Sequence, residues 1–118
     1  MASKHKNLSA HKEAVFKNAG KWKIAIVVSE YHDDITFALR DGCIEMLKKH
    51  GVKDKSIITQ LAPGAFELPL VAKWLYDKTN ADAVICLGCV IKGDTDHDKY
   101  INHAVADALM DLGLKTKT

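Results

Sequence analysis

Three apolar runs of strand length alternate with longer segments whose apolar residues recur at helical spacing. The runs are Ile24–Val28, Ile57–Leu61 and Ala83–Ile91. The first is continuous and rich in β-branched residues, a pattern typical of a strand buried on both faces of a parallel sheet. The order of strand and helix, repeated three times, therefore predicts an α/β fold with helices flanking a parallel sheet.

The predicted helices have recognisable start and stop signals. Asp33 or Asp34 can cap the first helix, and Gly51 stands where a glycine commonly ends one. The last helical segment holds Ile101 to Leu112, and Gly113 is predicted to end it.

The length of 118 residues fits one domain. We predict a flexible N-terminal arm over residues 1–21 and a single α/β domain over residues 22–118. Lysines cluster in the arm, but without an arginine-rich stripe or interleaved aromatics they do not predict nucleic-acid binding. No membrane-spanning or secretory segment is apparent, so we expect a cytoplasmic protein without a membrane partner.

The three cysteines are Cys43, Cys86 and Cys89. The spacing of the last two resembles a redox or zinc half-site, but both lie in the third apolar run. Residues three apart in a strand point to opposite faces, so we interpret the cysteines as small buried hydrophobes in a reducing compartment.

Polar loops follow the three strands at residues 29–32, 63–67 and 92–98. The carboxyl ends of parallel strands meet at one edge of a sheet, where α/β proteins bind ligands. Each loop also leads into a helix N-terminus, whose free N–H groups can hold an anion. The sequence therefore predicts a small-molecule site at this edge.

The third loop is the richest in reactive groups. Gly93 permits close approach of the backbone, Thr95 can donate its hydroxyl to a phosphate, and His97 can move protons near neutral pH. Two alternatives remain open: a solvated capping loop, and a magnesium or manganese site formed by the acidic cluster at residues 94–98.

The other loops allow two interpretations for each side chain. Glu67 either complements a helix dipole or accepts hydrogen bonds from a ligand, and Phe66 is either a hydrophobic staple or a binding contact. Tyr31 either covers the sheet edge or stacks on a flat heterocycle. We interpret the remaining histidines as structural or solvated: His5, His11, His32, His50 and His103.

Two long motifs make these loops specific. Residues 63–69 read PGAFELP, and residues 88–97 read GCVIKGDTDH. They resemble the PGAFE-[IL]-P and G-x-V-I-[RKQ]-G-x-T-x-H motifs of the lumazine synthase family, which acts in riboflavin biosynthesis. The resemblance covers about residues 22–114 and implies a three-layer αβα sandwich with a parallel, flavodoxin-like sheet.

The resemblance also implies a reaction. Enzymes of this family are transferases that condense 5-amino-6-(D-ribitylamino)uracil with 3,4-dihydroxy-2-butanone 4-phosphate. Imine formation, phosphate loss and ring closure give 6,7-dimethyl-8-ribityllumazine, and neither a metal nor an organic cofactor is needed.

Positions that match the family motifs imply roles for individual residues. Tyr31 would stack on the pyrimidine, and His97 would transfer protons. The residues that would contact the ribityl chain are Ala65, Phe66 and Glu67. The residues that would offer backbone groups to the pyrimidine are Val90 and Ile91. The residues that fall where the family binds phosphate are Asp94 and Thr95. Lys92 replaces the commoner arginine and lacks its bidentate donor geometry.

The resemblance implies an oligomer as well. Family members form homo-pentamers, often assembled into icosahedral shells of sixty subunits, and each site is shared between neighbours. The family continues past the last helix with a strand, two helices and phosphate-binding basic residues. We therefore expect a sheet truncated at its C-terminal end, which leaves open a catalytically disabled chain that only binds ligand or assembles.

A third hypothesis is a flavodoxin-like or receiver-like signalling module. Glu30, Asp33 and Asp34 follow the first strand, as acidic residues do in such modules, and magnesium-dependent phosphorylation of an aspartate would be expected. This hypothesis leaves both long motifs unexplained.

Overall fold

The computed structural model describes residues 14–118. The strands are β1 (Ile24–Ser29), β2 (Ile57–Ala62) and β3 (Ala83–Leu87). The long helices are α1 (Asp33–Lys49), α2 (Leu68–Thr79) and α3 (His97–Thr116), and the 3-10 helices are η1 (Ala19–Lys21), η2 (Asp54–Ser56) and η3 (Ala65–Glu67). Residues 1–13, which include much of the predicted arm together with His5 and His11, lie outside the described residues.

Within residues 14–118 the strands form one parallel sheet in the order β2-β1-β3. Ile24 lies opposite Ile57 on one side and Ala83 on the other, so the three strands start at the same level. Their carboxyl ends consequently reach the same edge of the sheet, as the sequence predicted.

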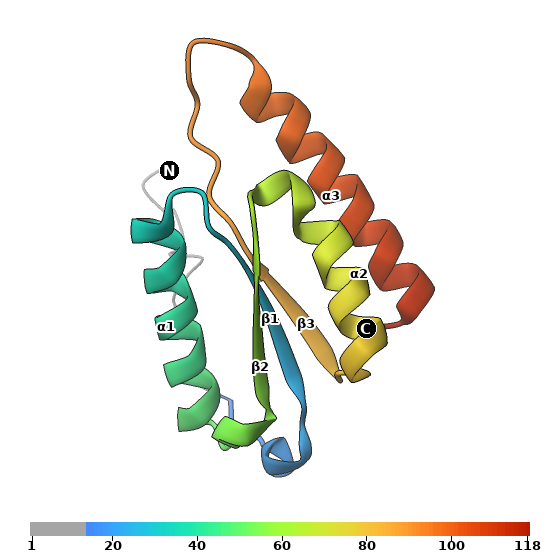
Figure 1. The fold of residues 1–118 in the computed structure, drawn as a ribbon. Helices are drawn as coiled ribbons and strands as arrows, with labels where there is room; N and C mark the ends of the chain where they lie inside the picture. The colour runs from blue at the N-terminus through green and yellow to red at the C-terminus, as the bar shows by residue number, and fades with distance from the viewer. Residues whose placement is uncertain (1–13) are drawn as a thin grey trace, which may run out of the picture.

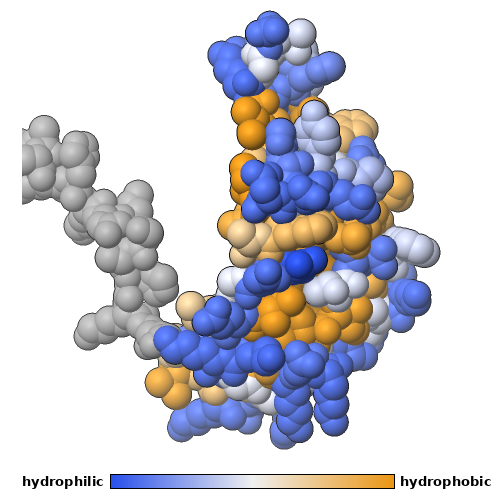
Figure 2. All heavy atoms as spheres, turned by 60° about the vertical axis from the view of Figure 1, so that its left-hand side comes forward, coloured by the Kyte–Doolittle hydropathy of each residue, from blue (hydrophilic) through white to orange (hydrophobic). Residues whose placement is uncertain are grey.

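Helices cover both faces of the sheet (Figure 1). Helix α1 lies on one face, and α2 and α3 lie together on the other. This arrangement confirms the predicted three-layer αβα sandwich. Figure 2 looks toward the side that carries α1 and shows exposed apolar residues among hydrophilic ones. No helix in the described part of the chain is long and apolar enough to cross a membrane.

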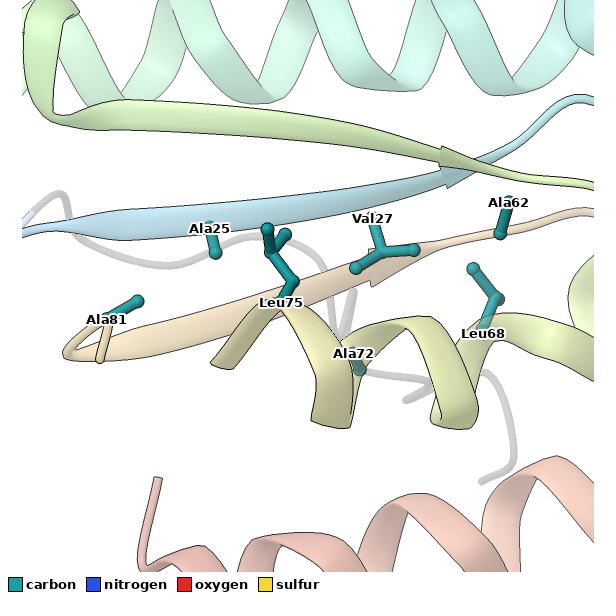
Figure 3. Close-up of a cluster of buried hydrophobic side chains, with 7 residues drawn as sticks. All are labelled: Ala25, Val27, Ala62, Leu68, Ala72, Leu75 and Ala81. Atoms are coloured by element: carbon teal, nitrogen blue, oxygen red, sulfur yellow. The ribbon is translucent and has the colours of Figure 1, made fainter. Parts of the chain in front are cut away.

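The core sits on both faces of β1, in which all six residues are buried. Ala25 and Val27 pack toward α2, where Leu68, Ala72 and Leu75 complete a cluster (Figure 3). The alternate β1 residues Ile24, Ile26 and Val28 form a second cluster on the opposite face. Apolar residues of α1 pack against this cluster. Burial of each valine or isoleucine side chain of β1 stabilises the fold by about 1.5–3 kcal/mol. The buried apolar residues of β1 therefore make a large contribution to the stability of the core.

The third strand is shorter than predicted. The apolar run continues to Ile91, but β3 ends at Leu87, because its pairing with β1 ends at Val28. Cys89 therefore lies in a loop, whereas Cys86 remains in the strand. All three cysteines are half-buried rather than buried as predicted, and the partial burial of Cys86 raises the pKa of its thiol to about 11.

Some predicted helix boundaries also differ. His32, not Asp33 or Asp34, occupies the N-cap position of α1, and the two aspartates lie in the first turn. Helix α3 continues through Gly113 and ends where Lys117 adopts a left-handed conformation. Gly51, in contrast, follows α1 with φ +104°, as expected of a glycine that ends a helix.

Candidate active site

A cavity of about 330 Å³ lies at the carboxyl edge of the sheet. All three polar loops contribute to it, although they are far apart in the sequence. The residues that line it are Tyr31, His32, Gly64, Ala65, Phe66, Cys89, Val90, Ile91, Gly93, Thr95, His97, Asp98 and Ile101. The structure thus brings together the loops that the sequence predicted to meet.

Backbone hydrogen bonds fasten the first loop to the second. The N–H of Glu30 donates to the carbonyl oxygen of Ala62 at 2.8 Å, and the N–H of Tyr31 donates to that of Pro63 at 3.1 Å. These bonds extend the contact between β1 and β2 beyond the sheet. They place the Tyr31 loop directly beside the loop that carries Phe66.

Two aromatic side chains are exposed at this cavity. Tyr31 is 67% exposed and Phe66 is 60% exposed, so both rings are accessible to a ligand. Aromatic faces offer apolar area and stacking geometry to a flat ring. This wall of the cavity is therefore suited to a planar heterocycle.

The third loop brings His97 to the first residue of α3. The His97 N–H donates to the Thr95 hydroxyl at 3.4 Å, and the Asp96 carbonyl accepts from the N–H of Lys99 at 3.1 Å. The His97 side chain is exposed, so its imidazole is accessible for proton transfer. The helix start beside it favours an anion.

The predicted site residues divide into two groups. Those that line the cavity are Tyr31, Ala65, Phe66, Val90, Ile91, Thr95 and His97. Glu67, Lys92 and Asp94 do not line it. Glu67 is the half-buried last residue of the second loop, and its Oε1 would lie 3.4 Å from a Cβ at Gly64. Lys92 and Asp94 are exposed on the loop whose Gly93 and Thr95 do line the cavity.

The cavity also has lining residues that sequence reasoning did not single out as ligand contacts. His32 follows Tyr31 directly, and that adjacency was the available signal. Cys89 was assigned to a strand and instead lies in a loop. Asp98 has a carboxylate oxygen, Oδ1, that is buried without a hydrogen-bond partner in the described part of the chain.

The metal alternative gains no support from the structure. Residues 14–118 contain no group of three or more His, Cys, Asp or Glu side chains that could hold a metal ion. Another cavity, of about 240 Å³, lies between α2, β3 and α3 and is lined by residues such as Val84, Cys86 and Leu112. Its lining side chains that can carry a proton are Tyr76 and Cys86, and burial raises the pKa of the Cys86 thiol to about 11.

Comparison with known proteins agrees with the motifs. A family model described as 6,7-dimethyl-8-ribityllumazine synthase matches residues 21–118. A protein of that name from Cytophaga hutchinsonii is 44% identical over 115 residues, which cover 98% of this chain and 72% of the relative. Relatives of the same name from Parabacteroides distasonis (40% identity; 97% and 71% covered) and Phocaeicola vulgatus (44%; 86% and 60%) are also similar. The chain thus spans about 60–72% of the length of these relatives.

Gly88 permits the close approach of the third loop to α2. A Cβ at this position would lie 2.8 Å from Cδ1 of buried Leu68 and 3.4 Å from Cβ of Ala65. We expect Gly88→Ala to lower the free energy of unfolding by about 2 kcal/mol through overpacking, as measured by urea denaturation.

Gly93→Ala is the matched control, because no atom of the described residues lies within 4 Å of a Cβ at Gly93. It should change the free energy of unfolding by less than about 0.5 kcal/mol. Equal stability of Gly88→Ala and the unmodified chain would contradict this account of the loop.

Proposed function

Because the chain belongs to the 6,7-dimethyl-8-ribityllumazine synthase family, we propose that it condenses 5-amino-6-(D-ribitylamino)uracil with 3,4-dihydroxy-2-butanone 4-phosphate to 6,7-dimethyl-8-ribityllumazine. The observation that carries the proposal is the shared cavity, in which Tyr31, Phe66 and His97 meet from three separate loops. We also propose a cytoplasmic location, because the three cysteines of the chain are free, as is usual in a reducing compartment.

The pyrimidine substrate occupies the aromatic side of the cavity. Tyr31 stacks on its ring, and the backbone at Val90 and Ile91 hydrogen-bonds the ring edge, because residues 88–91 follow the sheet without belonging to it. The ribityl chain runs along Ala65 and Phe66 toward Glu67. A carboxylate there accepts hydrogen bonds from sugar hydroxyls, which act as donors.

The butanone phosphate binds at the start of α3. The positive end of the α3 dipole attracts the phosphate, and the Thr95 hydroxyl is a donor for a phosphate oxygen, with Asp94 and Lys92 on the same loop. Asp94 adds a negative charge near the anion, which the exposed Lys92 ammonium offsets in part.

His97 transfers protons between the two subsites. An amine of the pyrimidine attacks the ketone carbonyl, and loss of water gives an imine. Loss of a proton from the adjacent carbon and departure of phosphate leave an enol, whose carbonyl form is then attacked by the second amine with loss of another water. Each stage moves a proton, which suits an imidazole, and much of the acceleration comes from alignment of the two substrates.

Self-assembly is the second part of the proposal. On α2, Leu70 is 72% exposed and Trp74 is 61% exposed, and the described sheet ends at unpaired β2 and β3 edges. Exposed apolar side chains and open strand edges favour association with another chain. We propose a homo-pentamer, or a sixty-subunit shell built from pentamers, with the small-molecule substrates as the other partners.

Product formation tests the reaction. The 118-residue chain should form the lumazine, followed by its absorbance, above the uncatalysed rate. His97→Ala should lower turnover by about 100-fold, since loss of a general acid–base group has this order of effect. Binding of the pyrimidine substrate, measured by calorimetry, should be nearly unchanged.

Two results would count against these assignments. A wild-type rate equal to the uncatalysed one would favour a chain that only binds ligand or assembles. Equal losses of turnover and pyrimidine affinity in His97→Ala would remove His97 from the proton-transfer role.

Glu67→Gln tests the ribityl subsite. The amide keeps the size of the side chain but loses the charge, so affinity for the ribitylaminouracil should fall by about tenfold. The KM for butanone phosphate should not change, because that substrate binds at α3. A raised KM for the phosphate alone would refute the placement of the ribityl chain.

Sedimentation velocity tests the assembly. We expect a species several times heavier than the 13.0-kDa chain, and its mass distinguishes a pentamer from a shell. Trp74→Lys should shift the distribution toward the monomer, because it places a charge in the apolar surface, whereas Lys73→Ala on the neighbouring exposed position should not. A purely monomeric wild-type chain would refute this part of the proposal.

A further inference from the structure

His32 adopts a backbone conformation that is unfavourable for most residues. Its φ of 60° and ψ of 51° lie in the left-handed region, which glycine and asparagine adopt more readily than residues with larger side chains. Such conformations persist where the surrounding structure imposes them, and they concentrate at functional sites. His32 also lines the cavity at the carboxyl edge of the sheet.

Hydrogen bonds on both sides fix the backbone at this position. Before it, the N–H of Tyr31 donates to the carbonyl of Pro63 at 3.1 Å. After it, the carbonyl of His32 accepts from the N–H groups of Ile35 and Thr36, both at 3.0 Å. The buried hydroxyl of Thr36 also donates to the Ser29 carbonyl at 2.6 Å, which closes the turn between β1 and α1. The direction of the His32 side chain is therefore set by the turn.

The His32 ring meets Tyr31 in an edge-to-face contact. The ring centroids are 4.4 Å apart, and the ring planes make an angle of 66°. His32 is half-buried, whereas Tyr31 is 67% exposed. An exposed tyrosine without such a neighbour exchanges among its staggered rotamers, and each rotamer points the ring in a different direction.

We propose that His32 is a positioning residue that holds the Tyr31 ring in the orientation required to stack on a flat heterocycle. The inference rests on the proposed function, in which that heterocycle is the pyrimidine of the ribitylaminouracil. An edge-to-face neighbour restricts the tyrosine while a face of its ring remains open to the ligand. An asparagine would be more stable in the left-handed backbone conformation but would provide no ring. The histidine therefore has a less favourable backbone conformation but orients the Tyr31 ring.

Steady-state kinetics of three variants test this role. His32→Asn should raise the KM for the pyrimidine by about fivefold, as expected from loss of one aromatic contact. The KM for butanone phosphate and kcat should remain close to those of the wild type. His32→Phe should restore the pyrimidine KM, because phenylalanine regains the ring edge. Lys117→Asn is the matched control: Lys117 is also left-handed, with φ 58°, but does not line the cavity.

The thermal midpoints separate strain from positioning. Both His32→Asn and Lys117→Asn should have an equal or higher Tm, since asparagine tolerates the left-handed conformation, while only His32→Asn should alter the pyrimidine KM. Equal increases in both KM values, or no rescue by His32→Phe, would overturn the positioning role.

Fluorine NMR of the chain labelled with 3-fluorotyrosine tests the same inference without substrate. The chain has three tyrosines, and the resonance of Tyr31 is the one lost in Tyr31→Phe. In His32→Asn this resonance should move toward the position of the free amino acid, and in His32→Phe it should remain displaced. An unchanged resonance in His32→Asn overturns the inference, whereas absence of wild-type turnover with the expected shifts refutes the proposed reaction alone.

Discussion

All six residues of β1 are buried, and this strand pairs with both β2 and β3. The remaining structure depends on that double burial. One set of β1 side chains requires α1 above the sheet, and the alternate set requires α2 below it. Because both neighbours are parallel and begin level with Ile24, their carboxyl ends, and the loops that follow, must converge at one edge. The position of the cavity therefore follows from the burial of β1 on both faces and from its parallel pairing with β2 and β3.

Much of this arrangement is predictable from the sequence, for a physical reason. The unalternated run Ile24–Val28 can be stable only if both of its faces are covered, which selects a parallel sheet between two helical layers. The polar residues after each run must then lie at one edge, as the cavity lined by Tyr31, Phe66 and His97 illustrates. The position of Gly51 just after the first helix was also predictable, because a positive φ is unfavourable for residues other than glycine.

The features that escaped prediction depend on pairing and tertiary context. The run Ala83–Ile91 is almost uniformly apolar, but β3 ends at Leu87, opposite Val28 and one residue before β1 itself ends. Gly113 costs a helix about 1 kcal/mol relative to alanine, yet α3 passes through it and packs on α2, where the Tyr76 hydroxyl donates to the Thr116 carbonyl at 3.5 Å. The left-handed conformation of His32 has no sequence signal, because hydrogen bonds from another loop and from α1 impose it.

Several energetically unfavourable features lie near the carboxyl edge of the sheet. His32 is left-handed there, and Ser29 Oγ and Asp98 Oδ1 are buried without a hydrogen-bond partner among residues 14–118, although buried polar atoms are normally hydrogen-bonded. Tyr31 and Phe66 expose large apolar areas at the same cavity. A fold selected for stability alone would place asparagine or glycine at position 32 and smaller polar side chains at positions 31 and 66. Burial of β1 on both faces supplies apolar stabilisation that offsets these costs, so the loops at its carboxyl end can carry side chains that suit a ligand better than they suit the fold.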